Sequence, residues 1–137
     1  AFLDFPLDGS TGYDAVPAGA RIVSATLEVF IETVEFAARI PTIIDLVSYQ
    51  IGALQPTDFD SDPLSDYSLS LDFFAEDMEN YVAIDVTALM AEAQQLGLLD
   101  FQVRFTLDFS TANGLVGIQD LPTVSITAPL LSVTYTY

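Results

Sequence analysis

The residues from Phe101 to Phe109 alternate strictly between apolar and polar side chains. A β-strand turns successive side chains to opposite faces of its sheet, so one face of this segment is expected to be buried and the other to meet solvent. The expected buried side chains are Phe101, Val103, Phe105, Leu107 and Phe109, and the expected exposed ones are Gln102, Arg104, Thr106 and Asp108. Such a strand indicates one sheet of a two-layer β fold.

Strand patterns recur along the chain, at residues 2–7, 22–34, 42–50 after a linker through Pro41, 69–73, 81–86, 115–119 and 130–137. From about residue 88 to 96, apolar side chains recur at three- and four-residue steps, which favours a short helix packed on the sheets. We predict an all-β fold, a two-sheet jelly-roll-like β-sandwich with one short helix (about 88–96). The length suits one core, so residues 1–137 are expected to form a single domain.

The charge balance is strongly acidic. The chain has 20 Asp and Glu against three arginines, with no lysine, for a net charge of −17. Nucleic-acid binding and binding to anionic lipid both depend on basic side chains, and no apolar run approaches membrane-spanning length, so nucleic acid and membrane insertion are not expected. The acidity fits either simple solubility or a medium rich in cations.

Catalytic chemistry finds little support in the composition. Without histidine, lysine or cysteine, the chain lacks the usual base for a nucleophilic triad. A pair of carboxylates remains a formal alternative, but the acidic residues are spread along the solvent faces of the expected strands. We expect a protein that is not an enzyme and has no catalytic residues.

An acidic run between residues 58 and 66 is the candidate metal site. Asp58, Asp60, Asp62 and Asp66 alternate along an irregular stretch, and Ca²⁺ prefers several oxygen ligands of this kind. A structural calcium ion is therefore one expectation. The other is a solvated acidic loop without metal.

Tyrosines are the candidate ligand-binding residues. Tyr13, Tyr49, Tyr67 and Tyr81 could stack on sugar rings if they are exposed in one groove, which would make polysaccharide a partner. Ordinary packing in the core and at strand edges is the alternative.

Four segments together resemble a known family. They are Phe2–Leu7 (FLDFPL), Val16–Val29 (VPAGARIVSATLEV), Val82–Leu89 (VAIDVTAL) leading into the helix, and Pro129–Tyr135 (PLLSVTY). Their order is similar to that of the DNRLRE domain, a jelly-roll β-sandwich related in shape to carbohydrate-binding modules. The resemblance implies a non-catalytic, extracellular or cell-surface module.

The resemblance also indicates how such a module could assemble. The family has a further strand before the segment that matches Phe2–Leu7, whereas Ala1 is the first residue of this chain. We expect the sheet to be completed by a strand from another copy, giving a homo-oligomer or a filament. A longer precursor that supplies the strand is one alternative, and a carbohydrate-binding module of a larger secreted protein is another.

Overall fold

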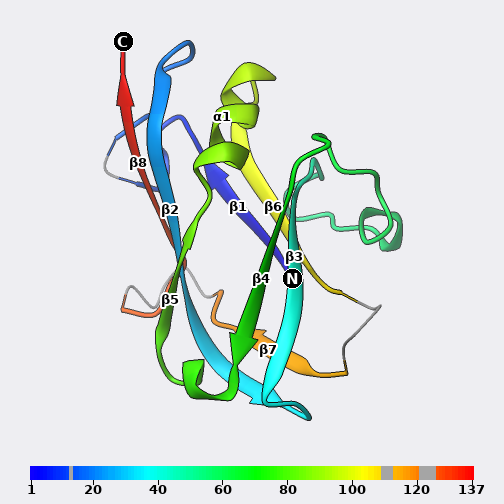
Figure 1. Cartoon of the computed structure of the whole chain (residues 1–137). Helices are drawn as coiled ribbons and strands as arrows, with labels where there is room; N and C mark the ends of the chain where they lie inside the picture. Colours follow the sequence, from blue (N-terminus) through cyan, green and yellow to red (C-terminus); the bar gives the residue numbers. More distant parts are fainter. Residues whose placement is uncertain (13, 109–112, 121–125) are drawn as a thin grey trace.

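Two antiparallel sheets face each other across an apolar core in the computed structural model (Figure 1). The structure describes residues 1–12, 14–108, 113–120 and 126–137. Sheet A has the order β1-β6-β3-β4, made of Phe2–Pro6, Asp100–Leu107, Arg39–Leu46 and Ser68–Phe74. Sheet B is built on β2, Arg21–Glu35, which pairs with β5, Tyr81–Asp85, β7, Leu115–Ile118, and β8, Leu130–Thr136. The predicted two-sheet β-sandwich is confirmed.

The long strand β2 explains why one element can organise a whole sheet. Its side chains alternate as predicted, and Leu27, Val29 and Ile31 are completely buried against sheet A. Different parts of β2 pair with three other strands, and a shift in register after Ile31 separates the part that pairs with β5 from the part that pairs with β7. The strand therefore spans sheet B from end to end.

The predicted helix is α1, Thr87–Gln95. It begins where the Asp85 carboxylate accepts hydrogen bonds from the Thr87 backbone N–H and hydroxyl, at 3.0 and 2.6 Å. It ends at Gly97, whose φ of 67° suits glycine. At nine residues it is short, and no helix in the described part of the chain is long and apolar enough to cross a membrane. Two short 3₁₀ turns complete the elements, η1 at Pro56–Asp58 and η2 at Ala75–Asp77.

One prediction for β6 is wrong. The odd residues from Phe101 to Phe105 are buried as expected, but Gln102 and Arg104 on the other face are only 5% and 6% exposed. The reason is that residues 47–67, which connect β3 to β4, fold over the outer face of sheet A. We call this segment the covering loop. It buries polar side chains that the alternation alone assigned to solvent.

The end of the predicted strand differs from its centre. Leu107 is half-buried and is the last residue of β6. Phe109, which the alternation places on the same face, lies outside the described residues. The strictly alternating pattern is therefore a strand as far as Leu107.

The expected linker at Pro41 is also wrong, because β3 already begins at Arg39. Proline cannot donate a backbone hydrogen bond, so it is unusual inside a sheet. Here the Pro41 carbonyl accepts from the Asp108 N–H at 3.0 Å, just past the end of β6. The missing donor therefore falls where the neighbouring strand stops.

Phe105 tests the packing of the inner face. Its side chain is 7% exposed in the core, so Phe105→Ala should lower the free energy of unfolding by about 3 to 5 kcal/mol through lost burial and the cavity left behind. Phe36→Ala is the matched control, because Phe36 is 83% exposed. Chemical denaturation of both variants measures the difference, and equal midpoints would mean that the inner face of β6 is assigned wrongly.

Candidate functional site

Arg104 holds the covering loop in place. Its Nη1 donates to the carbonyl oxygens of Asp58, Phe59 and Ser61 at 3.1, 3.0 and 2.8 Å. These residues lie more than forty positions away in sequence, on the loop that carries the predicted metal site. One guanidinium therefore gathers three carbonyl oxygens of the kind that a calcium ion would otherwise use.

The other end of the guanidinium is neutralised inside sheet A. Arg104 Nη2 lies 3.0 Å from Asp45 Oδ2 on β3, and both side chains are less than a tenth exposed. Asp45 Oδ1 accepts a hydrogen bond from the Ser68 hydroxyl at 2.5 Å, at the start of β4. The buried pair thus joins three strands of sheet A to the loop above them. A buried ion pair is retained only when hydrogen bonds satisfy its remaining groups, as these do in large part.

Gln102 fixes the beginning of the covering loop. Its side-chain amide accepts from the Tyr49 backbone N–H at 3.0 Å and donates to the Tyr49 carbonyl at 3.2 Å. The amide imitates a neighbouring strand, because it pairs with both backbone groups of one residue. Gln102 and Arg104 were missed as site residues, since nothing in their alternating pattern distinguishes them from solvent-facing side chains.

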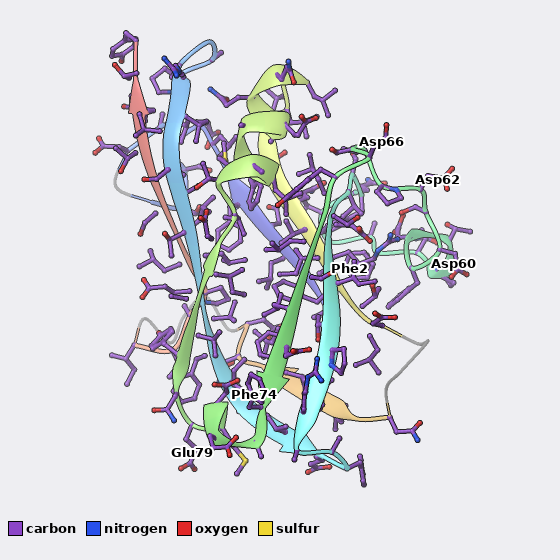
Figure 2. All side chains as sticks on the ribbon, viewed as in Figure 1. Phe2, Asp60, Asp62, Asp66, Phe74 and Glu79 are labelled. Atoms are coloured by element: carbon purple, nitrogen blue, oxygen red, sulfur yellow. The ribbon has the colours of Figure 1, made fainter. Side chains whose placement is uncertain are left out.

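The four candidate calcium ligands all lie on the covering loop. Asp58 accepts a hydrogen bond from the Gln55 backbone N–H through Oδ2 at 2.6 Å, which closes η1. Asp60, Asp62 and Asp66 are spread along the rim of the loop in Figure 2. Among the described residues, no three acidic side chains lie close enough to hold a metal ion. Calcium binding at Asp58, Asp60, Asp62 and Asp66 stays a prediction.

The candidate tyrosines do not share one cleft. Tyr49 and Tyr67 lie on the covering loop, Tyr81 begins β5 in the other sheet, and Tyr13 lies outside the described residues. The Tyr81 hydroxyl donates to the Ile126 carbonyl at 2.6 Å. Tyr49 packs edge to face on Phe2, with ring centroids 5.2 Å apart, and Phe59 packs on Phe2 from the loop at 5.0 Å. These rings contact one another, and they give sugar binding at the tyrosines no direct support.

Acidic side chains surround Tyr49 at the edge of sheet A. Burial, and then the charges of Asp4 and Asp100, raise the pKa of Tyr49 to about 12. Burial also raises the pKa of the Asp4 carboxyl above its ordinary value, against a lowering by the Gln102 hydrogen bond. Asp4 Oδ1 is buried without a hydrogen-bond partner in the described part of the structure. The ionised form of Asp4 is therefore disfavoured in the fold.

An apolar groove of about 140 Å³ opens between the two sheets. Side chains of β6 and β7 form most of its walls, and Phe73 of β4 contributes as well. The lining residues are Ala1, Thr42, Phe73, Phe105, Thr106, Leu107, Gly114, Leu115, Val116 and Ile118. A β-carbon at Gly114 would lie 2.6 Å from the Ile40 side chain, so this end of the groove depends on glycine. No charged side chain is among these lining residues of the described chain.

The backbone of β6 is open beside this groove. The Phe105 N–H donates to the Ala1 carbonyl at 2.7 Å, and β1 pairs with β6 from Phe2 onward. Backbone groups of successive strand residues point to opposite sides, so Leu107 points to the same side as Phe105. In the described residues no strand lies opposite Leu107 on that side. Leu107 therefore offers a backbone donor and acceptor at the mouth of an apolar groove.

Neither a protein-family model, nor a curated protein, nor a solved structure matches this chain.

Removal of the buried cation tests its role in the fold. Arg104→Ala should lower the free energy of unfolding by roughly 3 to 5 kcal/mol, because it leaves Asp45 buried and unpaired. The control is Arg39→Ala, since Arg39 pairs with Asp72 at 2.9 Å with its side chain 64% exposed and should contribute less than about 1 kcal/mol. Urea unfolding of both variants measures this, and a small loss for Arg104→Ala would refute the assigned role.

The raised pKa of Asp4 predicts a particular pH dependence. A carboxyl whose pKa is raised by folding destabilises the fold when it is ionised, and the cost disappears as pH falls to its ordinary pKa of 3.8 or below. Asp4→Asn should therefore raise the melting temperature at pH 7, and the gain should shrink as pH falls.

Asp85→Asn is the control of opposite sign for this experiment. Hydrogen bonds from Thr87 lower the pKa of Asp85, so ionised Asp85 stabilises the fold and this contribution is lost as pH falls. Asp85→Asn should thus lower the melting temperature at pH 7. Both variants remove one negative charge, so a general charge effect would shift them in the same direction.

Proposed function

We propose that this chain is a non-enzymatic structural module of an extracellular or cell-surface assembly, in which each copy accepts an extended segment of a neighbouring copy beside β6. The proposal rests on one observation, the unpaired backbone of Leu107 at the mouth of the inter-sheet groove. An open strand edge next to apolar side chains is the arrangement that strand addition uses.

The groove specifies the chemistry of the incoming segment. A residue paired with Leu107 directs its side chain to the same face of sheet A as Leu107, which is the face that lines the groove. That residue should be apolar and of moderate size, because the groove is apolar and measures about 140 Å³. The contact has to be apolar for a second reason, since copies of a chain with net charge −17 repel each other.

Such a contact joins two different surfaces of the same molecule. A heterologous contact forms a ring if its rotation closes and a filament if it does not. Salt should favour the assembly, because it screens the repulsion between acidic copies. An extracellular location and the similarity to the DNRLRE domain belong to this proposal, and both agree with a structural module.

The alternative function is carbohydrate binding. It is favoured by Phe59 and Tyr67, which are 54% and 44% exposed on the covering loop that Arg104 holds. The Phe59 ring packs edge to face on Phe2, so the two rings do not form a flat platform for a sugar. Strand addition is the better supported function for this reason.

Leu107→Pro tests the proposal. Proline removes the N–H that would bond the incoming segment, and Leu107 uses that N–H for no bond to β3 because its pairing with Thr42 is of the non-hydrogen-bonded kind. The variant should fold normally but lose assembly, as measured by light scattering and electron microscopy across protein and salt concentrations.

Leu107→Ala is the control for the side chain, because it keeps the N–H and removes apolar contact only. It should weaken assembly less than Leu107→Pro does. Wild-type protein that stays monomeric at every concentration and salt level would refute the proposal. Assembly that is undiminished in Leu107→Pro would refute the assigned site.

A further inference from the structure

The outer edge of sheet A at β4 is a second unpaired strand. Within the described residues, β4 pairs with β3 only and stands last in the order β1-β6-β3-β4. In Figure 1 it runs from the covering loop to η2 as one straight arrow. Its register with β3 is continuous over all seven residues, without a bulge. This edge lies apart from the groove proposed above.

The hydrogen bonds of β3 determine which groups of β4 face outward. Pro41 and Val47 bond to the β6 side, so Thr42 bonds toward β4, where its partner in register is Leu71. The backbone of Leu71 is therefore used inside the sheet. Ser70 and Asp72, its two neighbours, direct their N–H and C=O groups out of the sheet. In the part of the chain that the structure describes, no strand accepts them.

The features that usually protect an edge are absent from β4. Natural edge strands carry lysine, proline, bulges or inward charges that prevent pairing with another sheet. The sequence of β4 is Ser-Leu-Ser-Leu-Asp-Phe-Phe, which has none of the first three. By contrast, β1 at the opposite edge of sheet A ends with Pro6. At the end of β4 the Phe74 N–H is bonded to the Asp77 carboxylate at 2.7 Å, which leaves the centre of the strand as the open part.

Charge identifies a second copy as the occupant. The chain has only three arginines at a net charge of −17, and one of them, Arg39, pairs with Asp72 at 2.9 Å. Asp72 is the single charged residue of β4. The edge is thus locally neutral on a protein that is elsewhere acidic. A cationic partner would gain little at such an edge, whereas an identical edge would meet no repulsion there.

We infer that two copies of this chain pair through β4, antiparallel and around a two-fold axis at Leu71. Ser70 of each copy then exchanges both backbone hydrogen bonds with Asp72 of the other. Each Asp72 carboxylate meets a Ser70 hydroxyl, and the two Leu71 side chains, half-buried in each monomer, contact each other across the axis. The two copies of sheet A become one continuous sheet.

The ends of the paired strands limit and tune the contact. Asp66 precedes β4 and Asp77 follows it, so the antiparallel arrangement brings acidic side chains near each other at both ends. Salt should strengthen the dimer by screening these charges. Figure 2 shows Asp66 and Phe74 at opposite ends of this strand.

Ser70→Pro tests the inference, with Ser70→Ala as the matched control. The proline removes an outward N–H and no bond to β3, so the unfolding midpoint should stay close to that of the wild type. Sedimentation velocity should show a wild-type dimer that Ser70→Ala retains, whereas Ser70→Pro should raise the dissociation constant at least about tenfold, on the order of two lost backbone hydrogen bonds.

Two further measurements identify the edge. Amide hydrogen exchange should slow at Ser70 and Asp72 on dimerisation, while Leu71 is protected in the monomer already. Arg39→Gln should weaken the dimer several-fold at low salt, because it leaves Asp72 unpaired on both copies, and added salt should restore it. Leu107→Pro should leave this dimer intact, which separates it from strand addition at the groove. A wild-type monomer at all concentrations, or a dimer that Ser70→Pro does not weaken, would overturn the inference.

Discussion

The buried guanidinium of Arg104 supports the whole outer side of sheet A. It neutralises Asp45 inside the sheet and binds three backbone carbonyls of the covering loop. Without it, the loop would lose its attachment and two polar side chains of β6 would face solvent. The sandwich therefore has a third layer on one side, made of loop and not of regular structure. A cation supplied by the chain performs the structural task that a bound metal ion performs in many irregular loops.

The placement of positive charge matters because the chain has so little of it. Of the three arginines, Arg104 lies in the interior and Arg39 lies beside the edge strand β4. Elsewhere the surface is rich in carboxylates, which keep copies apart at low ionic strength. Contacts between copies are then confined to places that are apolar or locally neutral. The inter-sheet groove is apolar, and the centre of β4 is neutral.

Both proposed contacts use a general property of open sheets. A sandwich that does not close into a barrel leaves backbone donors and acceptors along its edges, and these bond to water or to another strand. At Leu107 the unpaired edge adjoins an apolar groove, so a segment that enters it also gains burial. At β4 the edge is longer and symmetric pairing is possible. One contact is directional and the other is two-fold, and together they would extend and cross-link an assembly.

The strands, the short helix and the buried apolar face of β6 could be predicted from the order of residues alone, because alternation and helical spacing are local properties of neighbouring residues. Local pattern could not reveal that Gln102 and Arg104 are buried, that Pro41 lies inside β3, or that the four aspartates of the covering loop are not gathered into one site. Each of these depends on segments far apart in the chain, as the bonds between Arg104 and residues 58–61 illustrate. The open edge at Leu107 is likewise a property of strand order. Which backbone groups have a neighbour is settled only when the sheets assemble, because pairing is a contact between strands and leaves no pattern within either one.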